Sequence, residues 1–367
     1  MGMTGREWER KIQWLPSLTM VLPMTSANQT RWNPAIHGDA LVDRFGRIHA
    51  NLRISVTDRC NIRCFYCMPL EGVQFKPRHE ILSFEEIERF VRVAAGMGIR
   101  KIRLTGGEPL VRHGIDRLVS RLAKVPGIED IALTTNGILL PQQAEGLKRA
   151  GLQRLNISLD TLSEERFQRI ARREGIRRVL DGIAAAREVG FQRIRLNAVA
   201  IRDLTEDDIV PLADFARRHG LELRFIEFMP LDGEQHWEDR QVLSGAEIRQ
   251  RLEEEFGPLV PTTRENPSQP AVDFDFADGC GRIGLINPVT EPFCGDCDRL
   301  RLTAEGQIRN CLFSTEEWDA RALLRGGGTD VQLAELMREC VGAKKAGHGI
   351  DNHDFVRPQR AMYQIGG

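Results

Sequence analysis

Short β-type runs alternate with longer amphipathic runs from about residue 48 onwards, and this alternation constrains the fold more than any other feature of the chain. Runs rich in branched apolar residues predict strands at 51–56, 101–105, 131–135, 154–159, 193–201 and 223–228. The stretches between them place apolar residues at helical spacing, at 84–97, 116–124, 142–150, 175–189 and 207–219. Repeated strand and helix units are typical of a parallel sheet covered by helices. The pattern therefore predicts an α/β fold with an incomplete (β/α)6 barrel.

The alternation ends near residue 230, which divides the chain into three expected regions. Residues 1–45 show no clear periodicity and are expected to form an irregular N-terminal extension. Residues 46–265 contain the barrel units. Residues 266–367 hold further β-like runs around a second group of cysteines, at 272–276, 282–286 and 298–303. We therefore expect a partial barrel followed by a smaller C-terminal region.

Composition excludes several classes of protein. Hydrophobic residues make up 41% and charged residues 28% of the 367 residues, as in globular proteins with little disorder. The formal net charge of −1 gives no electrostatic reason to expect a nucleic-acid partner. No apolar run is long enough for a transmembrane helix, so no membrane partner is expected. Eight cysteines are too few for a disulfide scaffold, and we expect a reducing cytoplasm.

Three cysteines, Cys60, Cys64 and Cys67, follow the first expected strand. Cysteine thiolates hold [4Fe-4S] clusters, and a fully ligated cluster takes four of them. A group of three therefore leaves one iron for an external ligand. A zinc site is the alternative, but the three-residue first gap and the lack of a nearby fourth ligand fit zinc less well.

A second trio consists of Cys294, Cys297 and Cys311 in the C-terminal region. Either Cys280 or Cys340 could supply a fourth ligand, which would make a zinc or four-thiolate site. If neither cysteine reaches the metal, the trio holds a second cluster with an open iron. That iron could bind a substrate atom. The spacing leaves both alternatives open.

Unusual polar and glycine residues gather where the expected strands end, at Cys60, Gly106–Pro109, Thr134–Gly137, Ser158, Asp160, Glu227 and Met229. Each group has an ordinary explanation, because such residues also make turns and helix caps. In barrel folds, however, ligand-binding groups gather at the carboxyl ends of the strands. Their joint position therefore predicts one binding site at this end of the barrel.

The spacing Cys60-x-x-x-Cys64-x-x-Cys67, with Tyr66 before the last cysteine, resembles the signature of the radical S-adenosylmethionine enzymes. The resemblance implies that S-adenosylmethionine chelates the open iron and that an electron from the cluster cleaves its sulfonium to a 5′-deoxyadenosyl radical. It also implies which residues contact this cofactor, namely Tyr66, Gly107, Ser158 and Met229.

From about residue 45 to 367, further motifs resemble the molybdenum cofactor branch of this family, at 52–60, 103–110, 134–137, 156–160, 224–229, the Cys294 block and the terminal Gly366-Gly367. This resemblance implies two [4Fe-4S] clusters. It implies that the radical removes hydrogen from C3′ of GTP and that the carbon radical attacks C8 of the guanine. The product would be 3′,8-cyclo-7,8-dihydro-GTP, the first intermediate of molybdenum cofactor biosynthesis.

The same resemblance implies a set of GTP-binding residues, namely Arg53, Arg103, Thr134, Arg195, Arg299, Leu300 and Arg301. Planar guanidinium groups suit a triphosphate because each can donate two hydrogen bonds to phosphate oxygens. Arg195 departs from the family pattern, which has lysine there. Catalytic roles are implied for Arg299, Arg301 and a C-terminal tail that brings Gly366 and Gly367 to the pocket.

The implied partners are GTP, a protein reductant and, downstream, cyclic pyranopterin monophosphate synthase, and a homodimer is left open. Two other interpretations of the cysteines remain. One is a radical S-adenosylmethionine enzyme that modifies peptides, since such enzymes often carry auxiliary clusters. The other is an iron-sulfur electron carrier or a zinc-binding module without catalytic activity.

Overall fold

Six parallel strands, paired in chain order, form the centre of the fold. The computed structural model of the chain describes residues 40–264, 266–350, 352 and 355–366, so most of the expected N-terminal extension lies outside the described residues. The central strands are β1 (Asn51–Ser55), β2 (Lys101–Thr105), β3 (Asp130–Thr135), β4 (Arg154–Ser158), β5 (Arg193–Ala200) and β6 (Glu222–Glu227). All six expected strands are confirmed to within one or two residues at each end.

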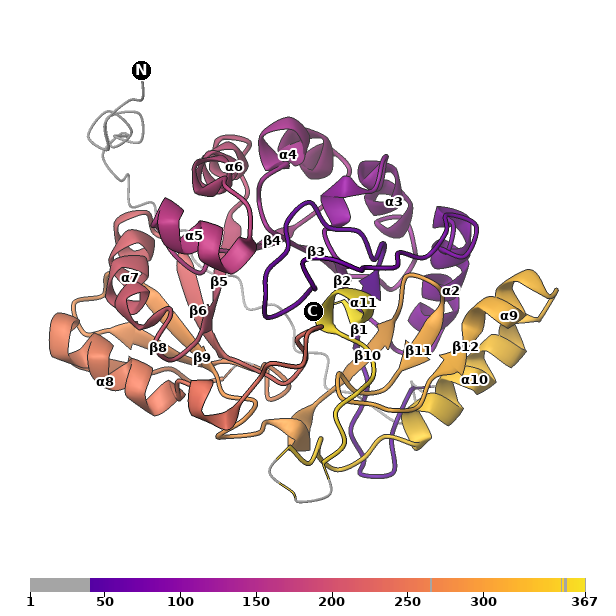
Figure 1. The fold of residues 1–367 in the computed structure, drawn as a ribbon. Helices are drawn as coiled ribbons and strands as arrows, with labels where there is room; N and C mark the ends of the chain where they lie inside the picture. The colour runs from indigo at the N-terminus through magenta and orange to yellow at the C-terminus, as the bar shows by residue number, and fades with distance from the viewer. Residues whose placement is uncertain (1–39, 265, 351, 353–354, 367) are drawn as a thin grey trace. The chain divides into compact units, whose positions relative to one another are not determined.

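Helices connect these strands, as the apolar spacing predicted. They are α2 (Phe84–Gly96), α3 (Ile115–Leu122), α4 (Leu140–Arg149), α6 (Ile176–Glu188) and α7 (Ile209–Arg218). Figure 1 shows α3, α4, α6 and α7 along the outside of the curved row of strands. Each buries its apolar stripe; α2, for example, buries Ile87, Phe90 and Val91. A short helix, α5 (Glu164–Ala171), begins at Ser163, whose side chain accepts a hydrogen bond from the Arg166 amide.

Strands from residue 259 onwards extend the sheet at both edges. Beyond β6 lie β9 (Arg282–Ile286), parallel to β6, then β8 (Val272–Phe276) and β7 (Leu259–Pro261), both antiparallel to their neighbours. Beyond β1 lie β10 (Arg299–Leu302), parallel to β1, then β11 (Gln307–Arg309) and β12 (Trp318–Asp319). Among the described residues, β7 and β12 form the two ends of an open sheet. The incomplete barrel is confirmed.

The remaining helices are α8 (Gly245–Phe256), α9 (Ala320–Arg325), α10 (Asp330–Gly342) and α11 (Met362–Ile365), with 3-10 turns at η1 (Pro109–Val111), η2 (Glu206–Asp208), η3 (Asp239–Gln241) and η4 (Cys294–Asp296). Figure 1 shows α11 beside β1 and β2. Gly366, directly after α11, lies against Ser55 and Thr105, the last residues of these strands. No helix in the described part of the chain is long and apolar enough to cross a membrane.

Candidate active site

A cavity of about 300 Å³ lies at the carboxyl ends of the parallel strands. Both cysteine trios line it, with Cys60, Cys64, Cys67, Cys294, Cys297 and Cys311. The groups expected at the strand ends line it as well, including Gly107, Thr134, Ser158, Asp160, Glu227 and Met229. The predicted convergence on one site at this end of the barrel is therefore confirmed.

Backbone contacts with the segment after β2 fix the loop that carries the first trio. The Gly107 amide donates to the Thr57 carbonyl at 2.8 Å, and the Glu108 amide donates to the Arg59 carbonyl at 2.8 Å. A Cβ atom on Gly107 would lie 2.5 Å from the Arg59 oxygen. Only glycine allows this approach. Gly107 thus positions the cysteine loop, whether or not it also touches a cofactor.

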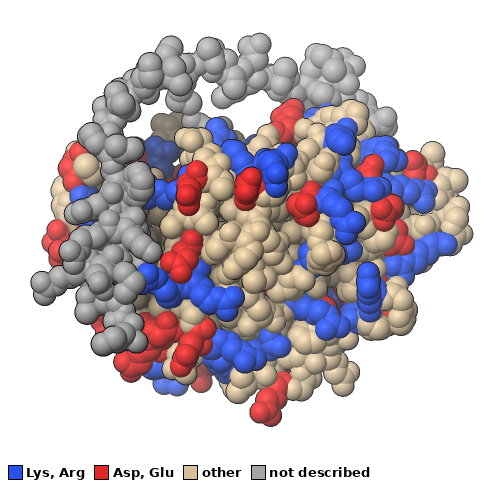
Figure 2. All heavy atoms as spheres, turned by 90° about the horizontal axis from the view of Figure 1, so that it is seen from above, with Lys and Arg blue, Asp and Glu red and all other residues tan. Residues whose placement is uncertain are grey.

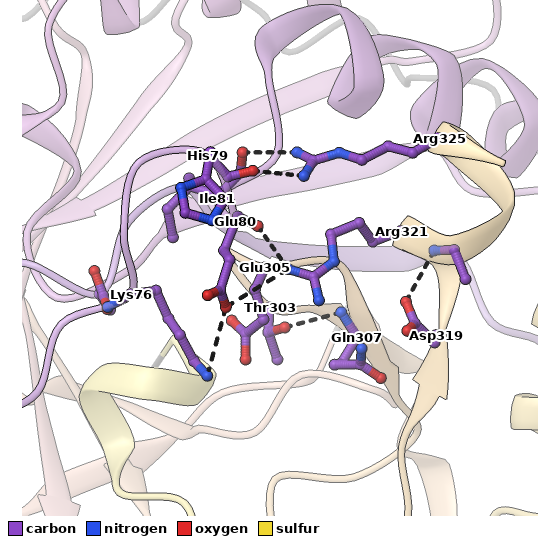
Figure 3. Close-up of polar contacts among 12 residues, drawn as sticks. Lys76, His79, Glu80, Ile81, Thr303, Glu305, Gln307, Asp319, Arg321 and Arg325 are labelled. Atoms are coloured by element: carbon purple, nitrogen blue, oxygen red, sulfur yellow. Dashed lines mark hydrogen bonds and ion pairs between the residues drawn. The ribbon is translucent and has the colours of Figure 1, made fainter.

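Two arginines of helix α9 form hydrogen bonds with residues 79–81, which connect the loop of the first trio to helix α2. Arg325 donates hydrogen bonds to the carbonyls of His79 (2.5 Å) and Ile81 (3.1 Å). Arg321 donates to the Glu80 carbonyl at 3.1 Å. Figure 3 shows both arginines reaching from α9 towards the 79–81 segment. The C-terminal region therefore helps to hold the loop of the N-terminal trio.

Burial dominates the chemistry of the first trio. Burial, followed by the charge of Glu108, raises the pKa of Cys60 to about 11. Burial followed by the charge of Asp160 also raises the pKa of Cys64. The carboxyls themselves are affected, since burial raises the pKa of Glu108 to about 7 and that of Asp160 to about 6. The protein alone thus disfavours thiolates here.

These thiols fit the iron-sulfur cluster that the motif predicts. All eight cysteines are free, and the three of this loop lie half-buried in one cavity. Iron supplies the positive charge that buried thiolates need. In the described residues, no three His, Cys, Asp or Glu side chains form a site for a single metal ion.

The residues expected to contact S-adenosylmethionine all line the cavity, namely Tyr66, Gly107, Ser158 and Met229. The Tyr66 hydroxyl donates to Asp160 Oδ2 at 2.6 Å, while Asp160 Oδ1 accepts from the Val199 amide at 2.8 Å. Asp160 therefore fixes the tyrosine within the cysteine loop. The cofactor contacts themselves stay predictions.

The second trio has cationic neighbours. Cys294 begins η4, Cys297 precedes β10, and Cys311 follows β11. Burial opposes ionisation of Cys297, but the charges of Arg299 and Lys344 outweigh it and lower the pKa to about 7. The Lys344 ammonium lies 3.5 Å from Cys297 Sγ.

Neither candidate for a fourth ligand reaches the cavity. Cys280 is exposed in the turn between β8 and β9, and Cys340 is buried within α10. Neither contributes to the cavity lining, which contains only the other six cysteines. The alternative of a site completed by either residue is therefore not supported by the geometry.

Arginines on adjacent strands form a cationic wall. The strand register places Arg53 of β1 between Arg103 of β2 and Arg301 of β10. Burial and then the charge of Arg301 lower the pKa of Arg53, and burial followed by the charge of Arg154 lowers that of Arg103 to about 9. On the surface shown in Figure 2, basic side chains lie among acidic ones. The cavity arginines instead lie next to one another, so their positive charges repel. An anionic ligand would relieve this repulsion.

Several polar atoms in the cavity lining lack partners within the described structure. Arg299 Nε and Nη2, Thr134 Oγ1 and Asn156 Nδ2 are buried without a hydrogen bond. Buried polar groups are normally satisfied, and unpaired ones destabilise a fold by about 1–3 kcal/mol each. These atoms therefore indicate a polar ligand that is part of the working site.

Three predicted residues do not line the cavity, and a fourth lies outside the described residues. Arg195 does not line the cavity, because its guanidinium donates to Glu222 Oε2 at 2.7 Å. Leu300 is buried and also absent from the lining. Gly366 lies next to the cavity, since its carbonyl accepts a hydrogen bond from Arg301 at 2.7 Å. Gly367 lies outside the described residues.

Arg224, Asn156 and Lys344 are among the cavity or near-cavity residues that were not predicted from the sequence. Arg224 and Asn156 line the cavity within motifs that were already recognised, so strand alternation could have indicated them. Lys344 carries no such signal. A lysine just after a helix is ordinarily an exposed residue at the helix C-terminus, yet Lys344 is only 3% exposed.

Comparison with known proteins agrees with this site. Residues 54–216 match the Radical SAM superfamily, and residues 221–350 match Molybdenum Cofactor Synthesis C. Among solved structures, Streptococcus suis SuiB bound to S-adenosylmethionine is similar, with a TM-score of 0.58 and 16% identity, covering 89% of this chain and 78% of that one. At this identity the likeness concerns the fold alone.

Curated relatives are much more similar in sequence. The chain is 55% identical over 331 residues to the GTP 3′,8-cyclase of Rhodopirellula baltica, covering 89% of this chain and 92% of the relative. It is 46% identical to the enzyme of that name from Corynebacterium glutamicum, covering 91% of each. It is 44% identical to that from Streptomyces coelicolor, covering 89% and 96%. The chain therefore belongs to the GTP 3′,8-cyclase family, within the radical S-adenosylmethionine superfamily.

Proposed function

We propose that this enzyme converts GTP to 3′,8-cyclo-7,8-dihydro-GTP, the first step of molybdenum cofactor biosynthesis. The observation that carries the proposal is that two cysteine trios and a wall of arginines line one cavity. When bound, a [4Fe-4S] cluster with S-adenosylmethionine supplies a 5′-deoxyadenosyl radical that removes hydrogen from C3′ of GTP. The chain's own residues bind the two substrates and orient them towards each other.

Cys60, Cys64 and Cys67 would hold this cluster, with Tyr66, Gly107, Ser158 and Met229 around the cofactor. Support comes from their shared place in the cavity lining. The nearby carboxyls of Glu108 and Asp160, whose pKa values burial raises to about 7 and about 6, add part of a negative charge each on this side at neutral pH. That charge suits S-adenosylmethionine, because its sulfonium is a cation.

Cys294, Cys297 and Cys311 would hold a second [4Fe-4S] cluster, whose open iron would take an atom of the guanine. Arg53, Arg103, Arg299 and Arg301 would bind the triphosphate, supported by their mutual repulsion and by the unpaired atoms of Arg299. Thr134 would add a hydroxyl contact. We expect Arg195 and Leu300 to act indirectly, through the strands that carry them.

Arg301 would also position the C-terminal tail. Its guanidinium is buried and donates to the Gly366 carbonyl at 2.7 Å. Met362 and Tyr363, one turn earlier, line the cavity. The tail would therefore close one side of the site and exclude water from radical intermediates, with Gly366 and Gly367 next to the substrate.

The proposal includes a protein reductant, a downstream cyclic pyranopterin monophosphate synthase that takes up the product, and a reducing cytoplasm. Eight free cysteines agree with such a compartment. A homodimer stays a prediction.

The decisive experiment is anaerobic incubation of the reconstituted protein with S-adenosylmethionine, dithionite and GTP carrying deuterium at C3′. We expect 5′-deoxyadenosine that contains deuterium, together with a cyclised nucleotide triphosphate, both detected by mass spectrometry. ATP in place of GTP is the matched control. Deuterium-free 5′-deoxyadenosine without a cyclised product would show that GTP is not the substrate.

A further inference from the structure

Lys344 is a buried cation in contact with the second cysteine trio. It directly follows the C-cap of α10 and is 3% exposed. Its ammonium donates to Cys297 Sγ at 3.5 Å and to the Arg299 carbonyl at 2.9 Å. Nothing in the proposed reaction yet uses this residue.

Hydrogen bonds from one arginine connect the segment that carries Lys344 to the loop that carries Cys294. Arg47 donates to the carbonyls of Cys294 (2.7 Å), Lys345 (2.7 Å) and Ala346 (3.0 Å). Asp43 holds Arg47 in turn, with Oδ2 2.6 Å from Arg47 Nε. One guanidinium therefore fixes the loop of Cys294 and the backbone next to Lys344 relative to each other.

A buried ammonium needs an anionic partner, because removing a charge from water is unfavourable unless the charge is paired. Among the described residues, Lys344 forms no ion pair with a carboxylate; the neighbouring groups that a metal could hold as anions are the thiols of Cys297 and Cys311. Metal-bound thiolates are anions that accept hydrogen bonds. The placement of Lys344 is therefore explained best by a ligated thiolate at Cys297.

We propose that Lys344 is a positioning residue of the second cluster: its ammonium hydrogen-bonds the Cys297 thiolate and raises the reduction potential of the [4Fe-4S] cluster held by this trio. The inference rests on the proposed function, which places a cluster there. Reduction adds one electron, and a fixed positive charge next to a ligand stabilises the more negative state.

The test uses the full chain with Cys60, Cys64 and Cys67 replaced by alanine, so that only the second cluster is observed. Lys344→Met removes the charge and keeps a side chain of similar length. Lys345→Met is the matched control, because Lys345 is adjacent but exposed. Each protein is reconstituted anaerobically without nucleotide, and the cluster is titrated with a redox dye series followed by EPR.

We expect Lys344→Met to lower the ratio of reduced to oxidised cluster about tenfold at a fixed solution potential, which corresponds to about 59 mV for a one-electron couple. Lys345→Met should titrate like the parent. An intact cluster with an unchanged potential in Lys344→Met would overturn the proposal.

Thermal unfolding of the cluster-free proteins separates this role from a purely structural one. Without the cluster the buried ammonium stabilises little, so Lys344→Met should unfold within about 2 °C of the parent. Loss of cluster from Lys344→Met at an unchanged unfolding temperature would support the positioning role. A lower unfolding temperature in the cluster-free variant would identify a structural lysine and refute the inference. If the parent holds no iron and sulfide at all, the proposed function itself fails.

Discussion

The two cysteine trios present the same number of thiols to the same cavity, but one thiol of each, Cys60 in the first and Cys297 in the second, has charged neighbours of opposite sign. Near the first trio, burial and the charge of Glu108 raise the pKa of Cys60 to about 11. Near the second, Arg299 and Lys344 outweigh burial and lower the pKa of Cys297 to about 7. The two trios therefore offer the same number of thiols, but Cys297 ionises far more readily than Cys60.

The difference follows from the elements that carry each trio. The first loop packs against the segment after β2 and the end of β4, which supply Glu108 and Asp160. The second trio flanks β10, whose alternate residues Arg299 and Arg301 are cationic. On the proposed function, a cationic sulfonium binds on the acidic side and an anionic triphosphate on the basic side. Charge thus assigns each ligand its half of one cavity.

The largest effect expected from this comparison is a separation of the two half-reactions. Alanine at Cys60, Cys64 or Cys67 should abolish cleavage of S-adenosylmethionine, because the first cluster cannot form. Alanine at Cys294, Cys297 or Cys311 should leave reductive cleavage without GTP intact and abolish the cyclised product. Chromatography of 5′-deoxyadenosine and nucleotide products measures both. Normal cyclisation by the second set would contradict a substrate role for that trio.

The unequal thiols can be compared directly in cluster-free protein. At pH 7 about half of Cys297 is thiolate, whereas Cys60 is almost entirely protonated, as their pKa values of about 7 and about 11 require. After allowing for the lower intrinsic nucleophilicity of the more acidic thiol, we expect iodoacetamide to label Cys297 about 100-fold faster. Peptide mapping over time measures the ratio. Equal labelling rates would remove the electrostatic distinction.

Loss of a cavity arginine should affect one ligand and spare the other. Arg299→Ala removes charge-assisted hydrogen bonds of about 1.5–3 kcal/mol, so GTP should bind about 10- to 100-fold more weakly. The affinity for S-adenosylmethionine should not change, because that ligand binds on the acidic side.

Arg195→Ala is the matched control for this experiment. Its guanidinium is paired with Glu222 outside the cavity lining, so we expect a smaller loss of GTP affinity. Calorimetry on anaerobic protein measures each affinity. A larger loss for Arg195→Ala than for Arg299→Ala would mean that Arg195 turns into the cavity when GTP binds.

The smallest effect concerns stability on the acidic side. Burial raises the pKa of Glu108 to about 7 in the folded protein, above its ordinary value of 4.5, so the folded state retains a proton that the unfolded state has lost. The free energy of unfolding should therefore fall as pH rises from about 4.5 to 7, by about 3 kcal/mol from this group.

Glu108→Gln should flatten this slope in cluster-free protein, while Glu129→Gln, at an exposed site, should leave it unchanged. Urea unfolding at a series of pH values measures both. An equally steep fall in Glu108→Gln would assign the dependence to other groups.

Much of the fold was predictable because its signals are local. Strands such as Arg154–Ser158 and helices such as Phe84–Gly96 follow from apolar periodicity and capping residues. The short elements β7, β11 and β12 could not be identified, since two or three residues carry no period. The pairing of β10 with β1, and of β9 with β6, was also not predictable, because neighbours in a sheet need not be neighbours in the chain.

The site divides in the same way. Cys60, Cys64 and Cys67 lie within eight residues, so spacing alone predicted a metal centre with an open position. The contact between Lys344 and Cys297 joins residues 47 positions apart. The pairing of Arg195 with Glu222 depends on the register of β5 with β6. Neither of these two contacts could be predicted from a local sequence pattern.

By itself, the sequence determined the alternation of strands and helices, the two cysteine trios and the family to which the chain belongs. The tertiary structure alone decided that both trios face one cavity, that Arg195 pairs with Glu222 outside its lining, and that Cys60 and Cys297 have neighbours of opposite charge. Apolar periodicity and the spacing of metal ligands depend on residues that are close together in the sequence. The dielectric surroundings and charged neighbours of a group are set by residues distant in sequence, which meet only when the sheet has formed.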